Sequence, residues 1–254
     1  ESVPNPLFRE SDLASQEKLA GVDFQVVASD PESFQAKEKI AAYYAMIEQI
    51  DDHVGRMLDC LNRSGQREDT LVIFTSDHGE MLGDHGLITK GCRFYEGLVH
   101  VPLIISWPSV ISQGIRKCSL VELTDIAPTL LDYAGIEKGE RMIGRSLRRL
   151  LESEVDAHRK FVRCEYYRAL SLLAKGREGW EGSYATMIRT YRYKLVVYHG
   201  HESGELFDLE KDPGEFNNLW SDPDCNEIRF DLMKAMLDQS AFAVDLGSET
   251  TCVF

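Results

Sequence analysis

One stretch of the sequence, Thr70 to Pro108, constrains the fold more than any other. It begins with an apolar run, Leu71 to Phe74, which breaks abruptly into a polar, glycine-rich segment; a second apolar run, Val101 to Trp107, follows. Short apolar runs rich in β-branched residues are typical of strands buried on both faces. We therefore expect two strands of an α/β sheet, with a loop that starts where the first strand ends.

The loop after the first run carries groups that suit a cation site. Ligands of open α/β sheets bind at the carboxyl ends of strands, where Asp77 and His78 stand. Both side chains can reach one divalent cation there, because the chain is turning out of the sheet and strict alternation of sides ends. An Asp-His pair at this place can also be a simple capping pair. The density of acids, histidines, glycines and bases up to Arg93 favours the functional interpretation, because strongly hydrated groups are costly to crowd together.

Composition excludes several classes of function. The formal net charge of −14 argues against a nucleic-acid-binding surface, and an anionic substrate would need a local cation such as a metal with Lys90 and Arg93. The six cysteines have no CxxC pairs, so neither a disulfide framework nor a zinc ribbon is indicated. No apolar run approaches the roughly 20 residues of a membrane span. A hydrophobic fraction of 43% in 254 residues is enough for a sizeable core.

The first part of the chain predicts one long helix before the Thr70–Pro108 stretch. Residues 1–28 show no period and predict an irregular connection. Asp30 and Pro31 form a good helix start, and the helix is expected to end near Gly65. The apolar residues at helical spacing are Ile40, Tyr43, Tyr44, Ile47, Ile50, Val54, Met57, Leu58 and Leu61.

The later part of the chain changes its pattern at about residue 155. Before that point we expect a strand over Ser119–Leu123, a helix capped by Thr124 or Asp125 and ending at Ala134, and a short basic surface helix over Ser146–Leu151. This alternation predicts residues 1–155 to be an α/β sheet flanked by helices. The expected strands after it are Phe161–Tyr167, Tyr184–Thr190, Lys194–His199 and Glu205–Leu209, with residues 175–182 as an exposed loop and a helix over Asp224–Ser240.

The sequence resembles a known family in four places, in the family's order. The segment SDHGEMLGDHGLITKG, followed by FYE and VPLII, is similar to the sulfatase branch of the alkaline-phosphatase-like superfamily. The other three similar segments are YYAMIEQIDDHVGRMLDCL, VELTDIAPTLLDYAGI and GELFDLEKDPGEFNNL. The resemblance implies an alkaline-phosphatase-like sheet over residues 1–155. It also implies a C-terminal subdomain, residues 156–254, with an antiparallel four-stranded sheet and a helix.

The resemblance also implies roles for particular residues. Asp77 and His78 would be two ligands of a single divalent cation, usually Ca²⁺, while the ligand types leave Mg²⁺, Mn²⁺ and Zn²⁺ open. Lys90 would be catalytic, contacting the sulfate group and the bridging oxygen of the ester. Arg93 and His100 are further candidate substrate contacts. For His85 we expect a hydrogen-bonding role that fixes the loop, with direct ligation or a substrate contact as the alternative.

One part of the family's pattern does not occur in this sequence. The nucleophile of these enzymes lies in a Cys-x-Pro-x-Arg or Ser-x-Pro-x-Arg motif, and both Cys164 and Cys225 lack the proline. The expectation is therefore the C-terminal part of a sulfatase, whose partners are its N-terminal part and a small-molecule or saccharide sulfate ester. A phosphonate monoester hydrolase or phosphodiesterase, and an inactive fragment, remain alternatives. The resemblance implies a periplasmic or secreted location, and a cytoplasmic one stays open.

Overall fold

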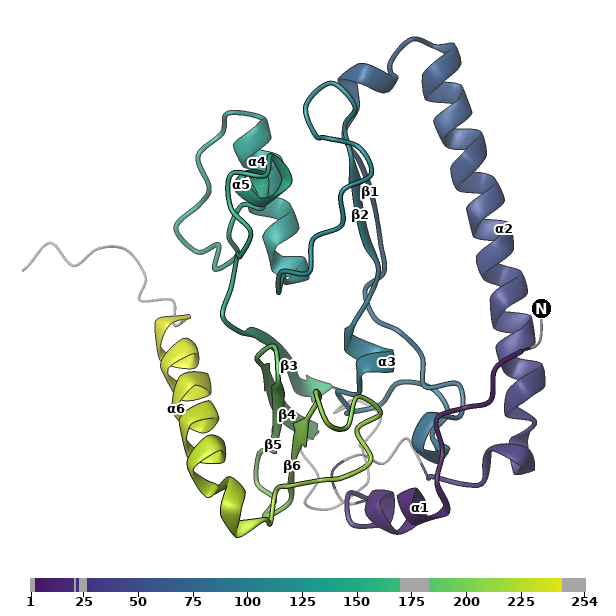
Figure 1. The fold of residues 1–254 in the computed structure, drawn as a ribbon, viewed down its shortest axis with the longest axis vertical. Helices are drawn as coiled ribbons and strands as arrows, with labels where there is room; N and C mark the ends of the chain where they lie inside the picture. The colour runs from purple at the N-terminus through teal and green to yellow at the C-terminus, as the bar shows by residue number, and fades with distance from the viewer. Residues whose placement is uncertain (1–2, 21, 23–26, 170–182, 244–254) are drawn as a thin grey trace, which may run out of the picture.

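The computed structural model describes residues 3–20, 22, 27–169 and 183–243. Figure 1 shows two groups of elements: a long helix beside a two-stranded ladder, and a four-stranded sheet with a helix along it. The ladder pairs β1 (Val72–Thr75) with β2 (Leu103–Ser106) in antiparallel register, Val72 opposite Ser106 and Thr75 opposite Leu103. No helix in the described part of the chain is long and apolar enough to cross a membrane.

The two strands of the ladder form where the apolar runs predict them, but their burial differs from the prediction. The first three residues of β1 are half-buried and Thr75 is exposed, while Ile104 of β2 is 60% exposed. The expectation of strands buried on both faces is therefore wrong for these ranges. The reason is that, among the described residues, β1 has one strand neighbour and no helix packed closely over it.

The long helix has its predicted position and an exposed apolar stripe. It is divided into η1 (Pro31–Phe34), capped by the Asp30 carboxylate on the backbone N–H of Glu32 at 2.9 Å, and α2 (Ala36–Arg63). In the described chain, α2 meets chiefly the short helices at its own ends, η1 and η2 (Arg67–Asp69). Its outward apolar side chains are Tyr44, Met46, Ile47, Ile50 and Met57.

The N-terminal segment contains a helix that the sequence pattern did not predict. Helix α1 (Glu10–Glu17) begins with the Arg9 backbone N–H donating to the Asp12 carboxylate at 2.8 Å. Asp12 and Gln16 are buried although they are polar. A polar helix that buries two polar residues leaves no apolar periodicity, so period-based analysis misses it.

Two expectations for the segment between the ladder and the C-terminal sheet are wrong: Ser119–Leu123 does not form a strand, and the helical segment that follows is capped by Glu122 rather than by Thr124 or Asp125. Residues 119–122 are extended but do not form a strand; instead the Glu122 carboxylate accepts the backbone N–H of Arg163 at 2.9 Å. Asp125 ends η4 (Leu123–Asp125) and is fully buried, accepting the Arg145 backbone N–H at 2.7 Å. Helix α4 (Ile126–Tyr133) and helix α5 (Arg148–Leu151) follow.

The C-terminal sheet agrees closely with the prediction. Its order is β3-β4-β5-β6, and every neighbouring pair is antiparallel. After η5 (Pro223–Cys225), helix α6 (Asn226–Phe242) covers one face with Leu232 and Met236, while Leu237, also expected on this face, is 69% exposed. The expected loop at 175–182 lies outside the described residues, and the domain boundary at 155 stays a prediction. The strands are β3 (Val162–Ala169), β4 (Ser183–Arg189), β5 (Tyr193–Tyr198) and β6 (Gly204–Asp208).

The loop after β1 packs against the other face of this sheet. Cys92 and Phe94 join a core with Met187 of β4 and Val196 of β5. The loop contains η3 (Asp84–Gly86) and leads into the one-turn helix α3 (Glu96–Val99). The polar loop and the C-terminal sheet are therefore one packed unit.

Gly79 and Gly97 bring the two ends of this loop into close backbone contact. The Gly79 N–H donates to the Leu98 carbonyl at 2.8 Å. A Cβ atom on Gly79 would lie 1.9 Å from the Gly97 carbonyl oxygen, a distance that real Cβ atoms do not reach. The crossing therefore requires glycine at position 79.

We expect Gly79→Ala to destabilise the fold by about 2 kcal/mol or more, because backbone must move to admit the methyl group. The matched control is Gly55→Ala in α2, where nothing lies within 4 Å of the added Cβ and alanine is the better helix former by up to about 1 kcal/mol. Urea unfolding of both variants checks this. Equal stability of the two variants would contradict the close crossing.

His85 is the buried histidine of the same loop. Its ring stacks on Tyr95 at a centroid distance of 4.1 Å, and its Nδ1 lies 3.6 Å from the Asp12 carboxylate. Burial lowers the pKa of His85 to about 4, against the opposing effect of the Asp212 carboxylate. His85 therefore fixes the loop in the interior, and its position does not favour the ligand alternative.

A histidine that is neutral in the folded protein makes stability depend on pH. The unfolded chain takes up a proton below about pH 6.5 and the folded protein only near pH 4, so stability is lost as pH falls through this window. From pH 7.5 to 5 the loss from this group is about 2 kcal/mol. We expect His85→Asn, which tolerates the φ of +54° at this position, to remove that part of the loss in urea unfolding. Exposed His53→Asn is the control; an unchanged pH dependence in His85→Asn would refute the assignment.

Candidate metal and ester-binding site

Asp77 and His78 leave β1 with their side chains turned towards each other. The Asp77 Oδ2 atom lies 3.6 Å from the His78 Nε2 atom. Two hydrogen bonds shape the turn that achieves this: the Ser76 hydroxyl donates to the His78 carbonyl at 2.8 Å, and Gly79 bonds to Leu98 as described. A carboxylate and an imidazole thus converge where the strand ends.

The hydrogen bonds of His78 select one tautomer of its ring. Nδ1 lies 2.7 Å from the carbonyl oxygen of Gly79, which can only accept, so Nδ1 carries the proton. The lone pair is then on Nε2, the atom that faces Asp77. A metal-binding histidine commonly has one ring nitrogen tied to a carbonyl and the lone pair on the other nitrogen. Here that lone pair meets the Lys90 ammonium, which a bound ion would displace.

The electrostatics of Asp77 also suit a cation. The His78 backbone N–H, which donates to the Asp77 carboxylate at 3.0 Å, and the Lys90 ammonium hold the pKa of the Asp77 carboxyl below its usual range. Its side chain is 86% exposed, so it is an ionised and accessible oxygen ligand. A carboxylate with a neutral imidazole suits hard or borderline divalent cations. The two residues therefore fit as part of a site for such an ion.

Lys90 brings a positive charge to the same place. Its Nζ atom lies 2.7 Å from the His78 Nε2 atom. The residues on either side of it, Thr89 and Gly91, both have left-handed backbone, with φ of +67° and +65°. A β-branched residue rarely adopts this conformation, and such strain is commonly retained at functional sites. The predicted ligand pair and the predicted catalytic cation are therefore brought together.

The described residues offer two candidate ligands at this position. Among them, no group of three or more His, Cys, Asp or Glu side chains is arranged to hold a metal ion. Asp84 accepts the Leu7 backbone N–H at 2.7 Å, and His85 is buried. Asp84 and His85 are thus committed to the structure of the loop.

His100 is the C-cap residue of α3 and lines the same cavity as Asp77 and His78. The His100 side chain is 75% exposed, and its Nδ1 atom is 3.1 Å from the Glu96 carboxylate. Glu96 was not predicted from the sequence. Its spacing of four residues from His100, which brings two side chains together on one helix face, is the signal that could have identified it.

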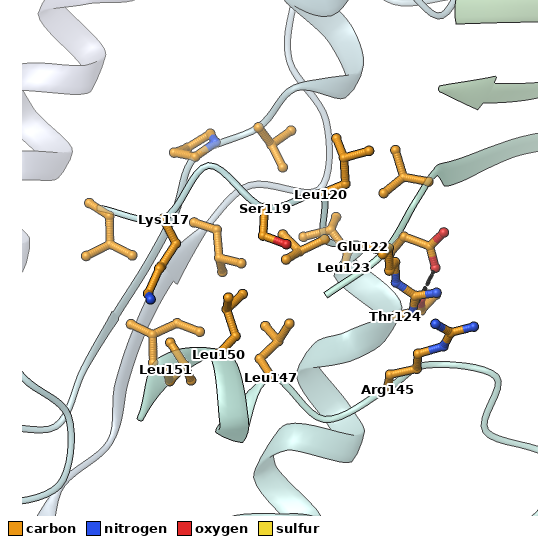
Figure 2. Close-up of a pocket in the computed structure, with 18 of the residues that line it drawn as sticks. Lys117, Ser119, Leu120, Glu122, Leu123, Thr124, Arg145, Leu147, Leu150 and Leu151 are labelled. Atoms are coloured by element: carbon orange, nitrogen blue, oxygen red, sulfur yellow. Dashed lines mark hydrogen bonds and ion pairs between the residues drawn. The ribbon is translucent and has the colours of Figure 1, made fainter. Parts of the chain in front are cut away.

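Asp77, His78 and His100 are among the residues that line a cavity of about 1670 Å³, together with residues of the ladder, α5, β3 and β4. Figure 2 shows part of this lining, where Leu147 and Leu150 point towards the segment that carries Leu120. Lys117, Glu122 and Arg145 line the same part, so the cavity has both apolar and charged walls.

Arg93 lies apart from this group. It is 3% exposed, and its guanidinium donates to the Gln16 side chain at 3.1 Å and to the Leu19 carbonyl at 3.4 Å. This position does not favour the substrate contact predicted for Arg93. The guanidinium instead ties the loop to the end of α1, the helix that the sequence analysis did not foresee.

Comparison with protein families matches two models to the chain. The model described as sulfatase matches residues 10–136, and the model described as the C-terminal part of N-sulphoglucosamine sulphohydrolase matches residues 83–241. An arylsulfatase of Clostridium perfringens is 32% identical over 240 residues, which is 93% of this chain and 47% of that protein. The chain thus spans less than half the length of this relative.

Solved structures show the same relationship. A phosphonate monoester hydrolase of Silicibacter pomeroyi matches with a TM-score of 0.81 and 28% identity, over 96% of this chain and 51% of that one. A structure solved in complex with its substrate D-glucosamine-2-N,6-O-disulfate matches with a TM-score of 0.72 and 29% identity, over 83% and 42%. These neighbours confirm the predicted alkaline-phosphatase-like fold class with its four-stranded C-terminal sheet. The chain belongs to the sulfatase family.

Proposed function

We propose that this chain carries part of the active site of a metal-dependent sulfate ester hydrolase. Asp77 and His78 would be two ligands of one divalent cation, with Ca²⁺ as the first choice because oxygen ligands are expected to dominate. The observation that carries the proposal is the convergence of the Asp77 Oδ2 and His78 Nε2 atoms, 3.6 Å apart, with the Lys90 ammonium 2.7 Å from the same ring nitrogen.

The chain's own residues would bind the ester and balance its charge. A bound divalent cation would polarise a sulfate oxygen and hold the attacking group in place. Lys90, a compact ammonium, would neutralise charge on the ester and on the oxygen that leaves. His100 would donate a hydrogen bond to an ester oxygen. Because the chain carries a net charge of −14, these local cations are what would make binding of an anion favourable.

The rest of the site would come from the N-terminal part of the same enzyme. Two observations support this: the described residues offer two candidate ligands, and the sequence has no Cys-x-Pro-x-Arg or Ser-x-Pro-x-Arg motif for the nucleophile. The stripe on α2 fits the same proposal, because Ile47, Ile50 and Met57 are each about half exposed or more. Apolar patches of this kind are usual at surfaces that another segment covers.

The substrate class has two candidates. Sulfate monoesters of small molecules or saccharides are favoured by the family and by the structural neighbour solved with a disulfated glucosamine. Phosphonate monoesters are the second candidate, because a phosphonate monoester hydrolase is structurally similar over 96% of the chain. Both esters present a tetrahedral anionic group to the same ligands.

Calcium binding by the isolated chain tests the ligand pair. We expect isothermal titration with CaCl₂ to show weak binding, and Asp77→Asn to weaken it about tenfold or more, because a charged ligand is lost. Asp156→Asn is the matched control, since that carboxylate is 99% exposed and pairs with Lys117 on the surface. Wild-type affinity in Asp77→Asn would remove the proposed metal site.

Turnover tests the proposal that the site is shared. We expect the isolated chain to show no repeated turnover of 4-nitrophenyl sulfate or of a 4-nitrophenyl phosphonate ester. Multiple turnovers of either ester by the isolated chain would contradict this and would identify the preferred ester directly. A chain that binds neither calcium nor an ester would be an inactive fragment, the third alternative.

A further inference from the structure

Glu96 joins His100 to the C-terminal sheet. One oxygen of its carboxylate, Oε2, lies 3.1 Å from the Nδ1 atom of His100. The other oxygen, Oε1, accepts from Lys194 Nζ at 2.7 Å and from Arg189 Nε at 3.1 Å. Arg189 ends β4 and Lys194 lies opposite it in β5, so residues of two neighbouring strands bind the Glu96 carboxylate.

The Lys194 ammonium is the anchor of the cluster. It is completely buried and bonds to the Glu215 carboxylate at 2.6 Å and to the Phe94 carbonyl at 2.9 Å, as well as to Glu96. Glu215 in turn accepts the backbone N–H of Glu96 at 2.7 Å. Glu96 is therefore held by its side chain and by its main chain.

This arrangement is more than helix α3 needs. The helix is a single turn of four residues, and an ordinary N-terminal cap would suffice to stabilise it. Burying the Lys194 ammonium and the Glu215 carboxylate, with Glu96 half-buried, is costly, and such clusters are weak evidence for stability alone. Burial raises the pKa of Glu96, but His100, Lys194 and Arg189 outweigh that effect and hold it at about 2. The carboxylate facing His100 is therefore permanently ionised near neutral pH.

We propose that Glu96 is a positioning residue that aims the Nε2–H of His100 at an anionic oxygen of an ester bound beside Asp77 and His78. Because Nδ1 faces Glu96, the opposite ring nitrogen faces away from the cluster, and His100 and His78 line the same cavity. The hydrogen bond to the Glu96 carboxylate raises the pKa of His100, and the protonated ring carries an N–H on both nitrogens, one for Glu96 and one for the ester. The C-terminal sheet thus sets the orientation of a substrate-binding side chain through Lys194. This inference rests on the proposed function of the site.

The test follows the His100 ring by ¹⁵N NMR while inorganic sulfate is added to the chain. In the wild type we expect the Nε2 signal of His100 to shift with sulfate and the Nδ1 signal to show a hydrogen bond to a carboxylate. Glu96→Gln should weaken the sulfate response about tenfold, since a charge-assisted hydrogen bond orients the ring. Glu210→Gln is the control: it removes a carboxylate that is 69% exposed and pairs with Arg192 at 3.5 Å, outside the cluster that holds Glu96, and should leave the sulfate response near that of the wild type.

A second variant guards against misfolding. Glu96→Asp keeps the charge beside Lys194 but shortens the side chain, so it should reproduce the loss at His100 while the ¹⁵N spectrum of the remaining chain stays folded. A wild-type His100 ring that ignores sulfate, or one that responds equally in the wild type and both Glu96 variants, overturns the positioning role.

Calcium titration separates this inference from the proposed function. Glu96 is not a proposed ligand, so Glu96→Gln should bind calcium as the wild type does. Calcium binding together with a His100 ring that is indifferent to Glu96→Gln overturns the positioning role alone. Absence of calcium binding in the wild type, with the His100 response still dependent on Glu96, overturns the metal site and leaves the positioning role supported.

Discussion

The contact between Gly79 and the first turn of α3 is the constraint on which the rest of the structure depends. Two backbone segments meet there with no room for a side chain at Gly79, and the Gly79 N–H bonds to Leu98 at 2.8 Å. This contact turns His78 towards Asp77 and, through α3, places Glu96 over the C-terminal sheet. The site and the ionic cluster around Lys194 are therefore two consequences of one close crossing.

Much of the fold follows from local pattern. The four strands of the C-terminal sheet, β1, β2 and the long helix could be predicted because each has an apolar run or an apolar period within its own residues. The failures share a cause. Helix α1 and the extended segment ending at Glu122 are held by bonds between polar groups distant in sequence, such as Glu122 to Arg163. The spacing of apolar residues does not predict such bonds.

The site was predictable only in part for the same reason. Asp77, His78 and Lys90 lie within one loop, so their proximity could be inferred from the sequence. Arg93 lies in that loop as well, yet its guanidinium turns inward to Gln16, a residue 77 positions away. Glu96, in α3, is held by an ion pair with Lys194 of β5, which lies 98 positions further along the chain. Contacts over such separations depend on the tertiary fold, which loop composition alone does not define.

The exposed apolar stripe of α2 affects how the chain behaves in solution. A helix of 28 residues presents apolar side chains outward, while the molecule carries 14 excess negative charges. Mutual repulsion would keep two copies apart at low ionic strength. At about 1 M salt the Debye length shrinks to roughly 3 Å, and that repulsion is largely screened. The exposed apolar side chains of α2 on two copies could then associate. The ionic strength of the buffer, as well as the sequence, would therefore decide whether the chain stays monomeric.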